Sequence, residues 1–263
     1  LFGLQYEKIE GIAVYHPDVE AFKVSDADGS LIGVILTDYF PRSTKRGGAW
    51  MNNFVNQEII DGEETRPVIV NVGNFAKPVD GKPSLLTLDQ VETLFHEYGH
   101  ALHGLLTQCT YKSVSGTSVA RDFVELPSQI MENWAFQPEV LDTYVRHYET
   151  GEVIPEELVA KIAAAENFNQ GFMTTELAAA AILDLKWHML PSVEGIDPIA
   201  FEAEACKAMG LIDEIIPRYR TTYFNHIFNS GYSAGYYSYL WAEVLDKDAC
   251  ELFKEKGIFD KET

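Results

Sequence analysis

The sequence predicts an α+β fold that is predominantly helical, with a small mixed or antiparallel sheet near the N-terminus. Residues 1 to about 80 hold short runs of β-branched residues separated by turn residues, which is typical of strands. Most of the remaining chain carries the periodicity of helices. With 263 residues and a hydrophobic content of 46%, the chain can build a substantial core.

The N-terminal part contains three predicted strands. The runs 20–24 and 30–36 flank the sequence Asp26-Ala27-Asp28-Gly29, which predicts a hairpin turn. A third strand is expected at residues 66–72. The part at 68–75 could lie at a sheet edge and pair with an extended peptide by strand addition, and an ordinary internal strand is an equally good interpretation.

A helix is expected to begin at Thr87-Leu88-Asp89-Gln90, which has the pattern of a capping box. Within it, His96 and His100 are four residues apart, so both imidazoles lie on one helix face and can bind one metal ion. Glu97 follows His96 and would lie beside that ion, where a carboxylate can accept a proton from water. A core helix with two hydrogen-bonded histidines is the alternative.

His103 follows His96 by seven residues, a helical rise of about 10.5 Å, and is therefore too far away to share the ion. We interpret it as a structural or supporting residue. Leu106 occupies the place where metzincins have a third histidine, which excludes that class.

A carboxylate must then complete the site. The next predicted helix, residues 119–134, follows a Ser/Gly/Thr loop and offers Asp122, Glu125 and Glu132 near one face. Spacing alone does not choose between these three. Pro127 should kink this helix, because proline lacks the N–H that a helix interior uses.

The later part of the chain is predicted to form a helical bundle behind the site, with helices at 155–168, 174–189, 198–209 and 217–228. The tyrosine segment, residues 229–239, combines two glycines with four tyrosines. The glycines would allow a mobile loop near a ligand, and tyrosine hydroxyls can donate to an oxyanion. Aromatic packing at the start of a helix is the alternative, and we expect it for Tyr236, Tyr237 and Trp241.

Three motifs carry a family resemblance: Phe95-His96-Glu97-Tyr98-Gly99-His100, the stretch 123–134 with Val-Glu-Leu-Pro-Ser-Gln, and the run 231–241. Together they resemble the thimet oligopeptidase family of zinc metallopeptidases. The six-residue gap from His226 to Tyr232 is similar to that of the bacterial dipeptidyl carboxypeptidases, or peptidyl-dipeptidases. Recognisable segments run from near the first residue to about residue 246.

The resemblance implies a zincin-like catalytic domain with Glu125 as the third zinc ligand, beside His96 and His100. It also places catalytic and substrate-binding contacts on Tyr232 and Tyr239, with His226 nearby. We expect supporting roles for Glu92 and for Asp122 or Glu132.

The resulting hypothesis is zinc-dependent hydrolysis of short oligopeptides, releasing C-terminal dipeptides, with one zinc ion per chain and Glu97 as the general base. The alternatives are an oligoendopeptidase of the same family, a non-catalytic peptide-binding module that retains the zinc fold, and a purely structural zinc domain. Structural zinc prefers four protein ligands, commonly cysteines, and the cysteines here are distant from the histidines.

The net charge of −20, from 40 acidic and 20 basic residues, argues against nucleic-acid binding. No apolar run approaches the roughly 18 residues that span a bilayer. The cysteines, Cys109, Cys206 and Cys250, are odd in number and far apart, which favours a reducing compartment. We therefore expect a cytoplasmic monomer that acts on short peptides, without membrane or nucleic-acid partners.

Leu1 is not a start methionine, and the proteins of the resembled family are far longer. We therefore interpret the chain as the catalytic region of a longer protein. It forms one domain over residues 1–263, with a β-rich part at 1–80, zinc-binding helices at 81–150, and a helical part at 151–263 that carries the tyrosine segment.

Overall fold

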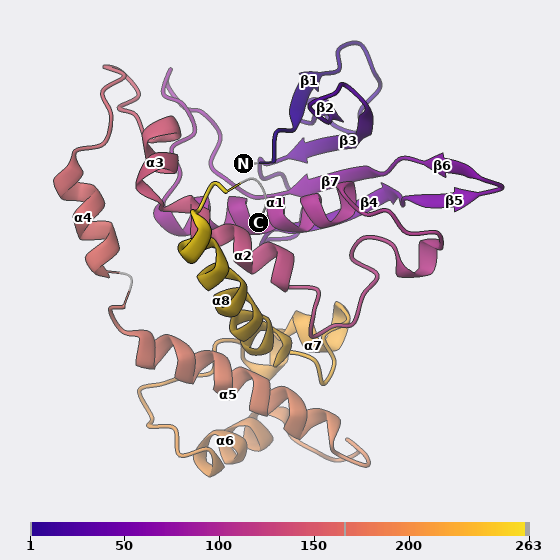
Figure 1. Cartoon of the computed structure of the whole chain (residues 1–263). Coiled ribbons are helices and arrows are strands. Elements are labelled where there is room, and N and C mark those ends of the chain that lie inside the picture. The colour runs from indigo at the N-terminus through magenta and orange to yellow at the C-terminus, as the bar shows by residue number, and fades with distance from the viewer. Residues whose placement is uncertain (1, 166, 261–263) are drawn as a thin grey trace.

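The computed structural model describes residues 2–165 and 167–260, and Figure 1 shows their arrangement. The strands are β1 (Gln5–Lys8), β2 (Glu20–Ser25), β3 (Leu31–Asp38), β4 (Trp50–Val55), β5 (Glu58–Ile60), β6 (Glu63–Thr65) and β7 (Val68–Val72). The helices are α1 (Leu88–Leu105), α2 (Leu126–Ala135), α3 (Pro138–Tyr144), α4 (Glu156–Ala165), α5 (Gln170–His188), α6 (Pro198–Ala208), α7 (Asn225–Asn229) and α8 (Ser238–Lys256), with short 3-10 helices at Lys112–Val114 and Thr221–Tyr223. The predicted α+β class is confirmed.

Five strands form one mixed sheet in the order β1-β2-β3-β7-β4, in which only the β3–β7 pair is parallel. The predicted hairpin joins β2 to β3. Its turn is closed by the Asp26 N–H, which donates to the Ser30 carbonyl at 2.9 Å, and Gly29 supplies a positive φ of 87°. Strands β5 and β6 form a separate hairpin that projects away from the sheet (Figure 1).

Strand β7 is internal, so the proposed strand addition at residues 68–75 is wrong. It is hydrogen-bonded to β3 on one side and to β4 on the other, which leaves its backbone groups no free edge. Residues 69–72 are all buried, as expected for a strand that is covered on both faces.

The two faces of the sheet are covered differently. On one face, Ile35 and Ile69 pack against Ala101 and Leu105 of α1. On the opposite face, a second apolar cluster around Val70 joins the sheet to the loop that precedes β2. The helix that carries the two candidate metal-binding histidines therefore rests directly on the sheet.

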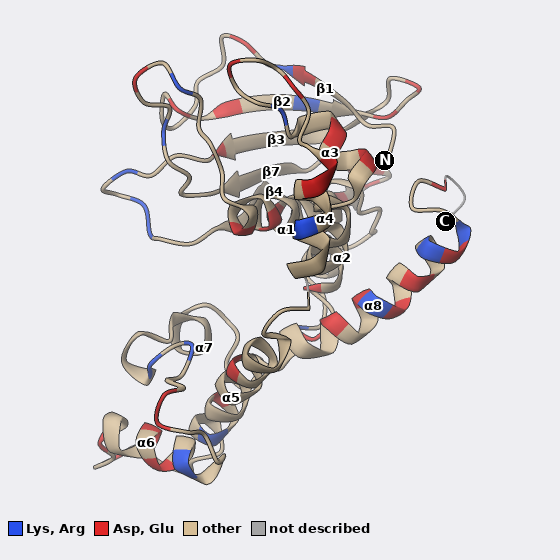
Figure 2. Ribbon diagram, turned by 90° about the vertical axis from the view of Figure 1, so that its left-hand side faces the viewer, with Lys and Arg blue, Asp and Glu red and all other residues tan. Residues whose placement is uncertain are grey.

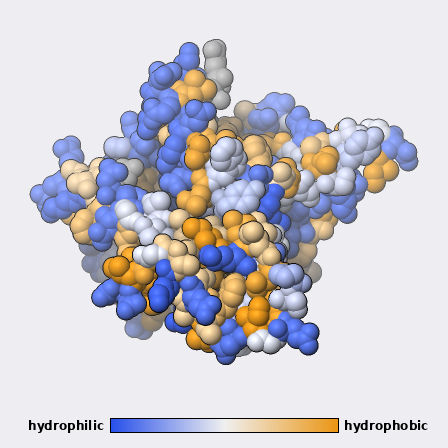
Figure 3. All heavy atoms as spheres, turned by 90° about the horizontal axis from the view of Figure 1, so that it is seen from below, coloured by the Kyte–Doolittle hydropathy of each residue, from blue (hydrophilic) through white to orange (hydrophobic). Residues whose placement is uncertain are grey.

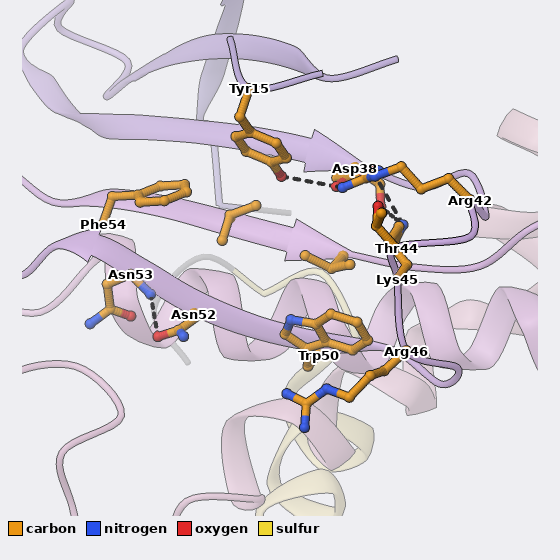
Figure 4. A pocket seen from close by; sticks show the side chains of 12 residues that line it. Tyr15, Asp38, Arg42, Thr44, Lys45, Arg46, Trp50, Asn52, Asn53 and Phe54 are labelled. Atoms are coloured by element: carbon orange, nitrogen blue, oxygen red, sulfur yellow. Dashed lines mark hydrogen bonds and ion pairs between the residues drawn. The ribbon is translucent and has the colours of Figure 1, made fainter. Parts of the chain in front are cut away.

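The opposite face also carries a pocket of about 300 Å³, shown in Figure 4, whose floor includes Val70 and Val72. Asp38, at the end of β3 and 1% exposed, accepts two hydrogen bonds from the Arg42 guanidinium, at 2.8 and 2.9 Å. Lys45 also donates to this carboxylate, at 3.2 Å. This network fixes the basic loop after β3 on the side of the sheet away from α1.

Helix α1 begins as predicted, with Thr87 as the N-cap and both hydrogen bonds of the capping box to Gln90 present. Helix α2 differs from the prediction, because it begins only at Leu126 and Pro127 lies in its first turn. Proline is well tolerated there, since the first-turn N–H groups have no intrahelical acceptor. Pro127 therefore starts the helix and does not kink it.

Helices α1 and α2 cross in direct backbone contact at Gly99. A Cβ atom at this position would lie 2.2 Å from the Pro127 carbonyl oxygen and 2.6 Å from the Ser128 Cα. Side chains further along both helices complete the contact, with Leu102, Met131 and Trp134 forming a cluster that Phe253 of α8 also covers. The absence of a side chain at Gly99 sets the distance between the two helices.

The C-terminal part contains the predicted helices α5 and α6, which form a core with α7 and with aromatic residues of the tyrosine segment. Helix α4 lies apart and buries none of its side chains. The predicted helix at 217–228 is wrong except for its last residues. The Thr221 N–H donates to the buried Glu202 carboxylate, at 2.6 Å, instead of to a helical carbonyl.

Acidic residues are spread over the helices and loops of both halves, in keeping with the strongly negative charge (Figure 2). Figure 3, which views the molecule from below, shows apolar side chains gathered among polar ones on that face. Among the described residues, no helix is both long and apolar enough to cross a bilayer.

Replacing Gly99 by alanine should separate α1 from α2 and destabilise the chain. The added Cβ meets backbone atoms, which cannot move aside as a flexible side chain could, so we expect a loss of about 3 kcal/mol in the free energy of unfolding. Urea denaturation of the parent and the variant measures this loss.

Gly171→Ala is the matched control, because a Cβ at Gly171 meets no atom within 4 Å. Gly171 lies in α5, so its replacement should change the free energy of unfolding by no more than about 1 kcal/mol. Equal unfolding midpoints for the two variants would show that the close approach at Gly99 does not limit the packing.

Candidate metal centre

Three side chains from α1 and the start of α2 converge on one point. His96 Nε2 lies 3.3 Å and His100 Nε2 lies 3.2 Å from Glu125 Oε2. Among the described residues, these three form the one group of His, Cys, Asp or Glu whose ligand atoms all lie within 4.8 Å of one another. As the four-residue spacing predicted, the rings of His96 and His100 lie on one face of α1 and point toward the same place.

The geometry of this group fits a zinc ion. Tetrahedral ligands at zinc distances of about 2.0–2.1 Å are separated from one another by about 3.3 Å, which is close to both measured separations. Two imidazoles and one carboxylate are also a donor set found in catalytic zinc sites, where the fourth position stays open. The residues present could therefore hold zinc without rearrangement.

The electrostatics of the group favour a cation. Burial by itself would lower the pKa of His96, but hydrogen bonds to Glu125 and Glu132 outweigh burial and raise this pKa to about 10. Burial by itself would raise the pKa of Glu125, but the two imidazoles hold that pKa well below its usual range. A bound metal ion would displace protons from the imidazoles and meet an anionic Glu125.

The three carboxylates that the sequence left open have separate environments. Glu125 is 1% exposed and faces both imidazoles. Glu132 Oε1 lies 2.6 Å from His96 Nδ1, on the side of the ring away from Glu125. Asp122 instead accepts a hydrogen bond from the Tyr237 hydroxyl, at 3.1 Å. Asp122 is therefore outside the metal group, and Glu132 is placed to orient His96.

Glu97 lies on α1 between the two histidines and is 8% exposed. Its Oε2 atom is buried and has no hydrogen-bond partner among the described residues. Burial raises the pKa of Glu97, although His96 and His100 act in the opposite direction. A carboxylate in this position, with one oxygen free of hydrogen bonds, is able to accept a proton from a water molecule.

The tyrosine segment closes over the metal group from the other half of the chain. The Tyr232 hydroxyl donates to Glu125 Oε1, and the Tyr239 ring stacks on that of Tyr232 with centroids 5.3 Å apart. The His226 ring lies beside both, with centroid distances of 6.1 Å to Tyr232 and 6.5 Å to Tyr239. The three residues that the resemblance indicated are therefore gathered at one place.

Two further residues beside the group were missed from the sequence. The Ser128 hydroxyl donates to Glu125 Oε2 at 2.9 Å, and the Gln129 side chain donates to the Tyr239 carbonyl at 3.1 Å. The sequence spacing could have indicated Ser128, since a serine three residues after Glu125 in the first turn of a helix can reach back to the Glu125 side chain.

His103 and Glu92 do not join the metal group. The His103 ring packs edge-on against Phe123, with centroids 6.5 Å apart, as expected for a structural residue. Glu92 is exposed at the surface of α1.

The whole chain, residues 1–263, matches the sequence profile of peptidase family M3. It is 48% identical over 264 residues to the dipeptidyl carboxypeptidase of Salmonella typhimurium, covering 100% of this chain and 38% of that protein. It is 42% identical over 266 residues to oligopeptidase A of Escherichia coli, covering 100% of this chain and 39% of that protein. A thimet-like oligopeptidase of Dictyostelium discoideum is 32% identical over 273 residues, covering 100% of this chain and 40% of the relative.

Glu132→Ala should weaken zinc binding about 10-fold to 100-fold, because it removes the partner that orients the His96 ring. Glu125→Ala should weaken it further, since Glu125 is a candidate ligand. Competition with a zinc-binding dye measures both dissociation constants.

Asp122→Ala is the control in this series, because Asp122 pairs with Tyr237 and not with the metal group. Its zinc affinity should stay close to that of the parent. A larger loss for Asp122→Ala than for Glu125→Ala would mean that the ligand has been assigned to the wrong carboxylate.

Proposed function

Because the chain belongs to peptidase family M3, we propose that it carries the zinc centre and the catalytic residues of an enzyme that hydrolyses short oligopeptides. Membership also confirms the family that the motifs around His96, Glu125 and Tyr232 indicated. The chain spans 38% of the length of the Salmonella dipeptidyl carboxypeptidase, so the activity and substrates of the whole protein are part of the proposal.

One observation carries the proposal above all: a buried carboxylate oxygen of Glu97, without a hydrogen-bond partner among the described residues, lies next to a three-residue group of zinc-ligand geometry. A structural zinc site would have no use for this carboxylate, and structural sites commonly close the fourth position with another protein ligand. The arrangement supports an open, catalytic centre.

In the proposed mechanism, His96, His100 and Glu125 hold zinc, which supplies Lewis-acid chemistry that polarises oxygen and acidifies water. Glu97 Oε2 accepts a proton from the attacking water and then passes it to the leaving amine. Glu132 holds the His96 ring in the orientation that leaves Nε2 free for the metal.

In the proposed reaction, the tyrosine hydroxyls donate to the oxygen that becomes negative, and the Tyr232 hydroxyl must turn away from Glu125 to do so. Burial and the nearby Glu125 raise the pKa of Tyr232, and burial raises the pKa of Tyr239 well above its usual value. Both hydroxyls therefore keep their protons at neutral pH and act as donors. His226, beside both rings, completes the proposed contacts to the substrate.

We assign dipeptide release from the C-terminus as the preferred action, because identity is higher to a protein named dipeptidyl carboxypeptidase than to one named oligopeptidase A. We also place the protein in the cytoplasm, in keeping with its three scattered cysteines. An oligoendopeptidase is the second candidate, supported by the 42% identity to oligopeptidase A.

Glu97→Gln should retain zinc and lose turnover. The amide keeps the shape of the side chain but cannot accept the proton, so kcat should fall at least about 100-fold on an internally quenched peptide. Zinc content, measured by elemental analysis, should stay at one ion per chain. A parental kcat in the variant would show that Glu97 is not the general base. A parent chain that binds zinc but cleaves no peptide would favour a non-catalytic peptide-binding module.

The direction of cleavage can be tested with one peptide in two forms. A peptide with a free C-terminal carboxylate should lose its last two residues, and the same peptide with a C-terminal amide should react at least about 100-fold more slowly, since a site built for a carboxylate rejects its absence strongly. Mass spectrometry of the products identifies the cleaved bond. Equal rates for both forms, with cleavage inside the chain, would establish the oligoendopeptidase instead.

A further inference from the structure

A fully buried carboxylate outside the metal group binds the backbone of the tyrosine segment. Asp184 lies on α5 and is 0% exposed. Its Oδ1 accepts the Ala234 N–H and its Oδ2 accepts the Tyr236 N–H, both at 2.9 Å. Both oxygens of one side chain therefore hold one turn of the segment.

A second side chain holds this carboxylate from its own helix. His188 Nδ1 lies 2.8 Å from Asp184 Oδ1, one turn later on α5. The carboxylate thus has charge-assisted or polar contacts on both oxygens, which offsets the cost of burying it.

The turn that Asp184 binds has a backbone conformation that needs support. Ala234 has a positive φ of 53°, which is unfavourable for a residue with a side chain. The Gly235 N–H donates to the Tyr232 carbonyl at 2.8 Å and so closes the turn. The bond from Ala234 to Asp184 thus offsets a local strain in the turn.

The anchored turn lies between the two tyrosines that reach the metal group. Tyr232 precedes it and donates to Glu125, while Tyr239 follows it in the first turn of α8. In the part of the chain that the structure describes, none of the hydrogen bonds or ion pairs of the Asp184 carboxylate reaches the metal group. Any influence it has on that group must pass through the placement of these two rings.

We propose that Asp184 is a positioning residue for catalysis, which fixes the turn at Ala234–Tyr236 and thereby holds the stacked rings of Tyr232 and Tyr239 beside the metal group. The part that concerns catalysis rests on the proposed peptidase function. The part that concerns the anchor stands on the hydrogen bonds alone.

Asp184→Asn is the direct test, because an asparagine has the same shape but only one oxygen acceptor. Its NH₂ group would face one of the two backbone N–H groups, so one bond of the anchor is lost. Asp38→Asn is the matched control. Asp38 is a comparably buried carboxylate, 1% exposed, but it binds Arg42 and Lys45 on the side of the sheet away from α1 (Figure 4).

The first measurement needs neither metal nor substrate. Hydrogen–deuterium exchange of peptides covering residues 231–237 should become about 10-fold faster in Asp184→Asn and stay unchanged in Asp38→Asn. Unchanged exchange in a folded Asp184→Asn protein would overturn the anchor, whatever the activity of the enzyme is.

The second measurement separates positioning from general damage. In Asp184→Asn, kcat should fall about 10-fold to 100-fold while KM and the zinc dissociation constant stay close to the parental values. Even where Asp38→Asn loses as much thermal stability, its kcat at a temperature below both unfolding midpoints should be parental. An equal fall of kcat in both variants would show that Asp184 has only a structural role, which would overturn the proposal.

If Asp184→Asn does not fold, His188→Ala replaces it in both measurements. It leaves the carboxylate and removes a partly exposed side chain that holds it, so exchange of the segment should rise and kcat should fall, each several-fold. Parental exchange and kcat in this variant would then overturn the proposal. A parent enzyme that cleaves no peptide would instead contradict the proposed function, and the exchange result would still decide the anchor.

Discussion

The backbone contact between α1 and α2 at Gly99 is the constraint on which the metal centre depends. Glu125 is the residue before α2, so its distance from the two histidines of α1 is set by how closely the helices approach. A side chain at Gly99 would hold them apart, and the ligand atoms now separated by little more than 3 Å would no longer meet one ion. The same approach lets the cluster around Leu102 and Trp134 form, which α8 covers. One missing Cβ therefore links the packing of three helices to the chemistry of the site.

The centre is also organised by charge. Glu97, Glu125 and Glu132 surround two imidazoles, so the group carries an excess of negative charge whenever the imidazoles are neutral. Such an arrangement is costly in a buried place unless a cation or protons offset it. A proton on His96 serves this purpose, and hydrogen bonds to Glu125 and Glu132 accordingly raise the pKa of His96. Hydrogen bonds from Ser128 and Tyr232 to Glu125 lower the cost further. The negative charges of this group therefore favour a cation at the point where the three side chains converge.

The sequence predicted the histidine pair and Glu97 because helical spacing alone fixes their mutual placement. Spacing alone could not choose among Asp122, Glu125 and Glu132, because that argument assumed one continuous helix over 119–134, and only the family resemblance indicated Glu125. The helix begins at Leu126, so residues before it do not follow helical periodicity, and Asp122 turns to Tyr237. The sequence left open whether β7 lies at an edge or inside the sheet, because the composition of a strand does not reveal which strands pair with it. The burial of residues 69–72 does follow from the sequence, since they belong to a nearly continuous apolar run. The failed helix at 217–228 depended on a distant partner, Glu202, which no local pattern could disclose.

The positions of the site residues in the sequence influence the order in which they come together during folding. The three candidate ligands lie in one compact stretch joined by a single loop, whereas Tyr232 comes 107 residues after Glu125. Closing a short loop costs less chain entropy than closing a long one, so contacts that are near in sequence can form first. A nascent chain can therefore bring the three candidate ligands together before the tyrosines have been synthesised. The aromatic side of the site would then assemble last, against a group of candidate ligands that has already formed.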